Sequence, residues 1–354
     1  MLPPKIRVLI IDDSAIARNT LSRILETDPE IQVVGTAPDA LIGLRKISEC
    51  LPDVLTLDVE MPKMDGLTFL ERLMSSKPMP VVMVSAYTAE GSETAMKALE
   101  LGALEIIEKP RIDVSSGLQD LALQITDKVK AAAQAKLKTP QQRFHQQVIP
   151  GRRIRSNASQ LPRIANTPNV IAFGASTGGT DSLREILAEL SPETPGILIV
   201  QHMPKAFTTS FAKNLDRVSK IRVKEAVSGD RLEPGLALLS PGDQHLELRR
   251  EAYGYCVELN SGALFNRHRP SVDVLFDSVA QNAGIDSMGI LLTGMGSDGA
   301  KGLLQMRQKG AWTIAQEESS CVVYGMPRVA VELQAPREVL NPQQIIERLG
   351  LLLH

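Results

Sequence analysis

The chain has 354 residues, of which 43% are hydrophobic and 23% charged, and its net charge at pH 7 is −2. This balance is typical of a soluble two-domain protein and argues against a disordered chain or one dominated by contacts to nucleic-acid phosphates. The three cysteines (Cys50, Cys256 and Cys321) are far apart, which excludes a dense disulfide framework or a C-x-x-C zinc site and favours the cytoplasm.

Five short apolar runs recur at regular intervals near the start of the chain, with amphipathic segments between them. This alternation predicts a parallel sheet covered by helices on both faces, with the ligand site at the carboxyl ends of the strands. None of the apolar runs is long enough for a signal peptide or a membrane span, so we expect no membrane insertion. The predicted strands cover residues 8–11, 32–34, 54–57, 81–84 and 104–107.

Polar side chains stand at the carboxyl ends of four of these strands. Asp12 and Asp13 follow the first strand, Asp58 the third, Ser85 the fourth and Lys109 the fifth. Carboxylates that converge on one edge repel one another and need a cation, and oxygen ligands suit Mg²⁺. With such an ion, Asp58 can accept a phosphoryl group while Ser85 hydrogen-bonds one of its oxygens and Lys109 neutralises charge.

This first segment resembles a response-regulator receiver domain. The resemblance rests on Asp12-Asp13, the stretch 57–66, Ser85 and Lys109-Pro110. It implies a flavodoxin-like (βα)₅ fold over residues 1–127 and phosphorylation of Asp58 by a histidine kinase. It also implies Mg²⁺ bound by Asp13, Asp58 and the backbone carbonyl of Glu60, with assistance from Asp12. One position departs from the pattern, because Ile106 stands where many receivers carry an aromatic switch residue.

Residues 128–168 differ in composition from the rest of the chain. They contain nine Lys or Arg, no Asp or Glu, and four prolines. Alanine and lysine at 128–136 are expected to extend the preceding helix, and the remainder reads as a basic flexible linker. Such a tract can steer toward nucleic acid or acidic protein surfaces, but a solvated tether is the commoner role.

The stretch 174–179, Gly-Ala-Ser-Thr-Gly-Gly, joins an apolar strand-like run to a helix-like segment. Small residues let the backbone bend sharply, leave the Ser176 hydroxyl uncovered and turn a helix N-terminus toward it, as a nucleophile needs. The simpler alternative is a strand-to-helix turn that needs glycine only for packing. A phosphate-binding loop is excluded, because Gly-Lys-Ser/Thr is absent.

A histidine and an aspartate follow two further strand-like runs. His202 comes after 196–200, and Asp298 comes after 289–293 within the glycine-rich stretch 294–299. In a doubly wound sheet these strand ends share one edge, so Ser176 could act as nucleophile, His202 as general base and Asp298 as the acid that orients the imidazole. The order Ser, His, Asp differs from that of α/β-hydrolases.

A competing interpretation concerns the glycine-rich stretch that contains Asp298. The stretch 294–299 also fits the dinucleotide-binding pattern G-x-G-x-x-G, although Asp298 would put a negative charge where a pyrophosphate should bind.

Among the remaining histidines, His145 and His245 are predicted to lie on the surface, and His268 is a candidate for the rim of the site.

Residues 169–354 resemble the catalytic domain of the chemotaxis protein-glutamate methylesterases, the CheB family. The resemblance rests on the stretches 174–179, 201–204, 268–276, 293–300 and 324–327. It implies a doubly wound, mostly parallel α/β fold and the triad Ser176, His202 and Asp298, with oxyanion donors at the backbone amides near Thr177 and Met295.

The same resemblance implies hydrolysis of γ-glutamyl methyl esters, and in some members glutamine amides, on the cytoplasmic helices of chemoreceptors. No organic cofactor is implied for the esterase chemistry, and the receiver is expected to inhibit it until Asp58 is phosphorylated. Two alternatives are a receiver-coupled DNA-binding regulator and a catalytically idle interaction module. The βα rhythm after residue 169 disfavours the first, so nucleic acid is not an expected partner.

Overall fold

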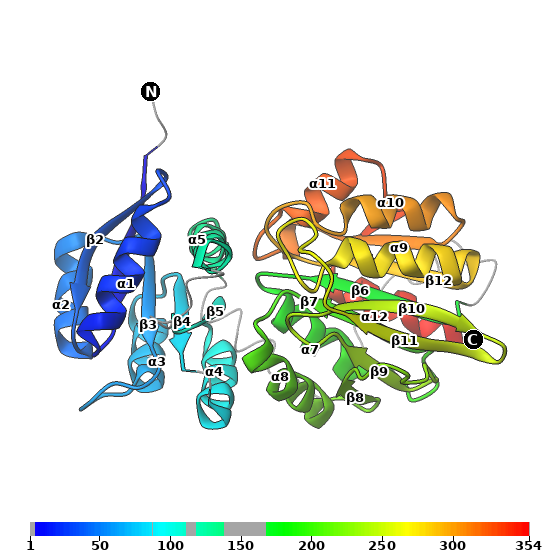
Figure 1. Cartoon of the computed structure of the whole chain (residues 1–354), viewed down its shortest axis with the longest axis horizontal. Helices are drawn as coiled ribbons and strands as arrows, with labels where there is room; N and C mark the ends of the chain where they lie inside the picture. Colours follow the sequence, from blue (N-terminus) through cyan, green and yellow to red (C-terminus); the bar gives the residue numbers. More distant parts are fainter. Residues whose placement is uncertain (1–3, 87, 111–117, 138–167, 354) are drawn as a thin grey trace. The chain divides into compact units, whose positions relative to one another are not determined.

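The computed structural model describes residues 4–86, 88–110, 118–137 and 168–353 (Figure 1). The chain divides into two compact units, Met1–Pro150 and Gly151–His354. Most of the predicted linker, including His145, lies outside the described residues. None of the helices in the described ranges combines the length and the hydrophobicity of a membrane-spanning helix.

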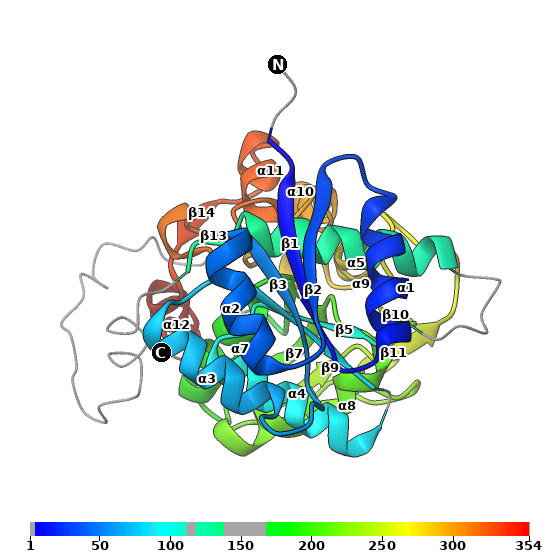
Figure 2. The same ribbon diagram turned by 90° about the vertical axis from the view of Figure 1, so that its left-hand side faces the viewer.

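The first unit contains a five-stranded parallel sheet with the strand order β2-β1-β3-β4-β5. This order is that of flavodoxin-like folds, as the resemblance to receiver domains implies, and its parallel strands confirm the sheet predicted from the spacing of the apolar runs. Figure 2 shows α1 and α5 on one side of this sheet and α2 and α3 on the other. The elements are β1 Ile6–Ile11, α1 Ala15–Glu26, β2 Ile31–Ala37, α2 Ala40–Cys50, β3 Val54–Asp58, α3 Gly66–Ser76, β4 Val81–Ser85, α4 Ala89–Leu101, β5 Glu105–Glu108 and α5 Leu118–Ala133.

Side-chain caps fix where the helices next to the strand ends begin. Ser14 accepts a hydrogen bond from the backbone N–H of Ala17 at the start of α1, and Asp65 accepts one from Thr68 at the start of α3. The residue after this second cap is Gly66, where a Cβ atom would lie 2.2 Å from the backbone oxygen of Asp58. Glycine is therefore required for α3 to begin directly beside Asp58.

Helix α5 runs past residue 127, as the alanines and lysines of this region predict. Val129 and Ala132 are fully buried in the core of the first unit. Lys128 forms an ion pair of 2.6 Å with Glu105 on β5. The start of the basic tract therefore belongs to the packing of this unit.

The second unit is built on a seven-stranded parallel sheet with the order β14-β13-β12-β6-β7-β9-β8. Its elements are β6 Val170–Ala175, α7 Gly179–Glu189, β7 Gly196–Gln201, α8 Lys205–Val218, β8 Arg222–Glu225, β9 Leu236–Leu239, β10 His245–Glu251, β11 Gly254–Asn260, α9 Val272–Asn282, β12 Ser287–Leu291, α10 Ala300–Gln308, β13 Trp312–Gln316, α11 Met326–Glu332, β14 Glu338–Leu340 and α12 Pro342–Gly350. The central strands β6, β7 and β12 are buried along their whole length.

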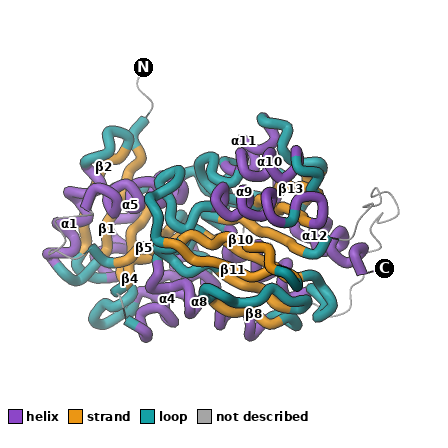
Figure 3. The backbone as a smooth tube through the Cα atoms, turned by 45° about the vertical axis from the view of Figure 1, so that its right-hand side comes forward, coloured by secondary structure: helices purple, strands orange, loops and turns teal. Residues whose placement is uncertain are grey.

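Helices cover both faces of this sheet, with α9 and α10 on one side and α7 and α8 on the other (Figure 1). The antiparallel pair of β10 and β11 lies outside the main sheet and packs on α9 (Figure 3). Leu246, Leu248 and Val257 of this pair join the apolar cluster formed by the strands, α9 and α10. The predicted doubly wound, mostly parallel α/β fold is confirmed, with one β-hairpin added.

Candidate functional site

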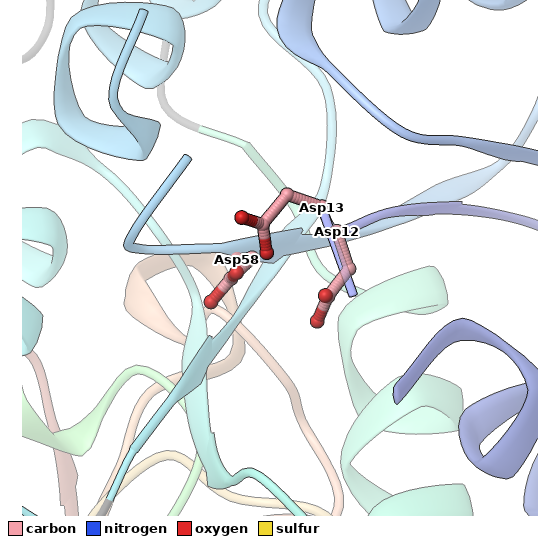
Figure 4. Close-up of side chains that lie close together, drawn as sticks. All are labelled: Asp12, Asp13 and Asp58. Carbon is pink, nitrogen blue, oxygen red and sulfur yellow. The ribbon is translucent and has the colours of Figure 1, made fainter. Parts of the chain in front are cut away.

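Three carboxylates meet at the carboxyl edge of the first unit's sheet. Asp12 and Asp13 follow β1 and Asp58 ends β3, and one oxygen from each residue lies within 4.8 Å of the others (Figure 4). Asp12 and Asp58 are buried, and Asp13 is exposed. The structure therefore brings together the acidic residues that the sequence placed at neighbouring strand ends.

Lys109 lies between two of these carboxylates. Its Nζ atom is 2.9 Å from Oδ2 of Asp58 and 3.1 Å from Oδ2 of Asp12. Burial raises the pKa of Asp58 to about 6, even though Lys109 opposes that rise. Burial also raises the pKa of Asp12.

The remaining residues predicted for this edge lie around Asp58. The backbone of Glu60 hydrogen-bonds the Asp58 carboxylate. The Ser85 hydroxyl donates to the backbone oxygen of Gly91 over 3.1 Å, and the backbone N–H of Lys109 donates to the backbone oxygen of Ser85 over 2.8 Å. Oxygen ligands alone, including the three carboxylates at this edge, fit a hard divalent cation such as Mg²⁺.

In the second unit, Ser176 and His202 follow the ends of two neighbouring parallel strands. Ala175, the last residue of β6, pairs with Gln201, the last residue of β7. Ser176 follows Ala175 in the chain, and His202 follows Gln201. The His202 backbone N–H donates to the Ala175 oxygen over 3.0 Å. The backbone oxygen of Ser176 accepts hydrogen bonds from the Gly179 N–H and from Nε2 of Gln201, which hold the serine turn in shape.

His202 and Asp298 are in direct contact. Nε2 of His202 lies 2.9 Å from Oδ2 of Asp298, and both residues are buried. Because the carboxylate accepts, Nε2 carries the proton and Nδ1 keeps a lone pair. Nδ1 is buried and has no hydrogen-bond partner in the described part of the chain, so no bond to the Ser176 hydroxyl is formed in this structure. Such contacts are often loose in unliganded sites.

Asp298 is held by several hydrogen-bond donors. The backbone N–H groups of Val272 and Asp273, at the N-terminus of α9, donate over 2.7 and 3.3 Å, and the hydroxyl of the capping residue Ser271 donates over 2.8 Å. Nδ2 of Asn266 adds a bond of 2.8 Å. Burial would raise the pKa of Asp298, but the hydrogen bond and charge of His202, the hydrogen bond from Asn266 and the charge of His268 hold that pKa well below its ordinary value.

The predicted oxyanion residues are close to Ser176, because Thr177 is the next residue in the chain and Met295 follows Gly294, which packs against Ser176. Thr177 is buried, and its backbone oxygen accepts a 3.0 Å hydrogen bond from the hydroxyl of Thr293. Met295 follows Gly294, where a Cβ atom would lie only 2.7 Å from Cβ of Ser176. The segment carrying Met295 therefore approaches the serine more closely than any residue other than glycine would allow at position 294.

Two histidines outside the predicted triad also belong to this region. The ring of His268 stacks on that of His202, with centroids 3.8 Å apart and 13° between the planes. The prediction that His245 lies on the surface is wrong, because only 3% of it is exposed. Its Nδ1 accepts from the Ser271 N–H and its Nε2 donates to the backbone oxygen of Ala263, so the first residue of β10 holds the loop that leads to α9.

Sequence reasoning did not single out Asn266, Ser271, Gln201 or Thr293. Each acts through a hydrogen bond to a residue at least 25 positions away, and such contacts leave no local pattern. Ser271 alone carries a local signal, because a serine directly before an apolar run is a typical helix N-cap.

The two sites define a phosphorylation-type receiver fused to an α/β unit with a hydrolase-like Ser, His and Asp arrangement. Residues 8–116 match the family model for the response regulator receiver domain, and residues 171–349 match that for CheB methylesterase. The chain belongs to the CheB methylesterase family.

Relatives and a solved structure agree with this assignment. The chain is 49% identical to a protein-glutamate methylesterase/protein-glutamine glutaminase of Ralstonia nicotianae, over 96% of this chain and 94% of the relative. It is also 49% identical to one from Pseudomonas aeruginosa, over 96% and 95%. The Thermotoga maritima CheB methylesterase catalytic domain superposes with a TM-score of 0.50 at 37% identity, covering 51% of this chain and 97% of that one.

Proposed function

We propose that the chain hydrolyses γ-methyl esters of glutamate on chemoreceptors, and that it can also deamidate glutamine side chains there. The names of the relatives supply the substrate class. The observation that carries the chemistry is the 2.9 Å hydrogen bond between His202 and Asp298 beside the turn that presents Ser176. An ester and a primary amide share the acyl carbonyl that such a serine attacks.

The reaction follows from these groups. Nδ1 of His202 takes the proton of the Ser176 hydroxyl as Oγ bonds to the γ-carbonyl carbon, and backbone amides near Thr177 and Met295 stabilise the oxyanion. His202 then gives that proton to the departing methoxide, and methanol leaves an acyl-enzyme. Water, deprotonated by His202, attacks the acyl-enzyme, and His202 returns that proton to Oγ of Ser176 as the C–O bond breaks and glutamate leaves. Asp298 stabilises the imidazolium in both steps.

We further propose that phosphorylation of Asp58 raises the esterase rate. A histidine kinase of a chemotaxis-type pathway is the proposed phosphodonor. Asp13, Asp58 and the Glu60 carbonyl would hold Mg²⁺, with Asp12 assisting, and the ion would neutralise the phosphoryl oxygens. Lys109 would then pair with the phosphoryl group in place of the Asp58 carboxylate, and Ser85 would turn its hydroxyl toward it.

The decisive experiment is release of methanol from methylated receptor, with and without acetyl phosphate and Mg²⁺. Wild-type chain should release methanol faster with the phosphodonor. Ser176→Ala should lower turnover by roughly 10⁶-fold if the three residues act as a unit. Near-normal methanol release by Ser176→Ala would refute the serine mechanism. Residues 169–354 expressed alone should be more active than the unphosphorylated full chain, and equal rates would refute inhibition by the receiver.

A further inference from the structure

A two-residue turn lies beside the candidate triad. The backbone N–H of Phe265 donates to the His268 oxygen over 3.1 Å, and that of His268 donates to the Phe265 oxygen over 2.9 Å. Between them Asn266 and Arg267 have φ values of 50° and 68°. Positive φ at both positions is the conformation of a type I′ turn, which non-glycine residues other than asparagine and aspartate adopt at a cost. Surrounding contacts must therefore hold this turn in place.

The side chain of Asn266 provides two such contacts. Its Nδ2 atom donates to Oδ1 of Asp298 over 2.8 Å and to Oδ2 of Asp273 over 2.7 Å. An amide nitrogen carries two hydrogens, so each carboxylate receives one. Asp273 is itself tied to α10, because its Oδ1 accepts from the Gly302 N–H over 2.6 Å. Asn266 therefore links the turn to two buried carboxylates.

The contact orients the Asp298 carboxylate. Asn266 and Ser271 bind Oδ1, while the Val272 N–H and His202 bind Oδ2. With Oδ1 held in this way, Oδ2 is directed at the imidazole. Ser271, Val272 and Asp273, which also donate to Asp298, belong to the N-terminus of α9 or its cap, whereas Asn266 belongs to the turn. The turn also carries His268, whose ring stacks on that of His202.

We propose that Asn266 is a positioning residue for the reaction, and that the 265–268 turn acts as a two-point clamp. The Asn266 amide sets the rotation of the Asp298 carboxylate, and the His268 ring sets the plane of His202. The clamp thereby fixes both partners of the hydrogen bond that makes His202 a base. This inference rests on the proposed esterase function.

Two substitutions at position 266 distinguish the effect of the Asn266 side-chain amide from the effect of the turn's backbone conformation. Asn266→Gly keeps the positive φ and removes the amide. Asn266→Asp keeps the shape and tolerates the turn, but places a third carboxylate against Asp298 and Asp273. In the full chain with methylated receptor, Asn266→Gly should lower kcat by roughly 10- to 100-fold, with KM within about twofold, since one hydrogen bond to a charged group is lost. Asn266→Asp should be lower still.

The kcat values of the two variants, relative to each other and to the wild type, decide whether the Asn266 amide positions Asp298. If the side chain only filled space, Asn266→Asp would stay near the wild-type kcat and Asn266→Gly would not. If only the turn conformation mattered, both variants would stay near it. Either result overturns the proposal. Gln334→Gly is the matched control, because exposed Gln334 also has a positive φ, of 56°, and follows α11, away from the site; it should keep the wild-type kcat.

A double variant separates catalysis from folding. Combining Asn266→Asp with Asp273→Asn restores an amide that faces a carboxylate between these two positions. Unfolding followed by the fluorescence of Trp312 should return toward the wild-type temperature, while kcat stays low because position 266 still opposes Asp298. Recovery of kcat together with stability would show that Asn266 acts through the fold, and would overturn the proposal.

A readout that does not depend on turnover separates this inference from the proposed function. In the ¹⁵N-labelled full chain, the downfield proton resonance of His202 Nε2–H reports on its hydrogen bond to Asp298. We expect Asn266→Gly to shift this resonance upfield and Gln334→Gly to leave it in place. If the His202 Nε2–H resonance stays in place in both Asn266→Gly and Gln334→Gly, the proposal that Asn266 positions Asp298 is overturned. Wild-type chain that releases no methanol refutes the esterase function, whatever the resonance does.

Discussion

Nε2 of His202 and Oδ2 of Asp298 are 2.9 Å apart, although 96 positions separate the two residues in the chain. Their strands, β7 and β12, flank β6 on opposite sides. The contact therefore spans the end of the strand that leads into Ser176. A parallel sheet with β6 between its two neighbours brings the three side chains to one edge without a long loop.

The Asp298→Asn variant tests the role of this carboxylate. The asparagine amide would turn a donor toward one of the groups that now donate to Asp298, and it would leave the imidazolium without a counter-charge. We expect kcat for methanol release to fall by roughly 10³- to 10⁴-fold, with the variant still folded. The control is Asp286→Asn, because Asp286 comes directly before β12, at the end opposite to the one that Asp298 follows. This variant should retain the wild-type rate. A loss of less than tenfold in Asp298→Asn would exclude the proposed role.

The Gly294→Ala variant tests how closely the 294–299 stretch must approach the serine. The added Cβ atom would lie 2.7 Å from Cβ of Ser176 and 2.2 Å from Sδ of Met326, so the serine turn or α11 must shift. A displacement of about 1 Å can cost roughly 100-fold in rate, and we expect a loss of kcat of that order. Gly350→Ala is the control, because a Cβ atom there meets no atom within 4 Å. Equal rates for the two variants would contradict the expected crowding.

Lys109 should be required for the response to phosphorylation. Its Nζ atom contacts both Asp58 and Asp12. After phosphorylation, the same ammonium group could form an ion pair with the phosphoryl oxygens on Asp58. We expect Lys109→Gln to accept phosphate from acetyl phosphate but to lose the stimulation of methanol release. Lys97→Gln, at an exposed position on α4, serves as the control and should respond as the wild type does. Full stimulation of Lys109→Gln would remove Lys109 from the switch.

Asp273 should make the stability of the catalytic unit depend on pH. Burial raises its pKa to about 6, and only 1% of the residue is exposed. Because the unfolded chain ionises first as pH rises, the folded state loses stability between about pH 4 and pH 6. Relative to Asp273→Asn, the wild-type free energy of unfolding should fall by about 3 kcal/mol over this range.

Urea unfolding at several pH values measures this difference. Trp312 is the chain's single tryptophan and lies on β13, so its fluorescence reports on the catalytic unit alone. Asp298 titrates in both proteins and cancels in the comparison. A difference in unfolding free energy that stays constant from pH 4 to pH 7 would show that Asp273 has an ordinary pKa.

The linear order of residues was sufficient to predict both folds and the places of the candidate residues. Apolar runs at βα spacing define parallel strands, and polar residues directly after those runs must lie at one edge of the sheet. For this reason the sequence predicts the candidate residues Asp58, Lys109, Ser176, His202 and Asp298. Glycines at 66 and 294 belong to the same local patterns, and their close contacts with Asp58 and Ser176 explain why no larger residue fits.

Only the tertiary structure decided what surrounds Asp298 and His202. Asn266, Ser271 and the N-terminus of α9 converge on one carboxylate from a turn and a helix, and the buried His245 holds the loop between them. These contacts depend on how a hairpin packs on a helix, which no periodicity in the sequence encodes. Strand spacing is a short-range property of the chain, whereas the orientation of a carboxylate is set by donors that meet only after the chain has folded.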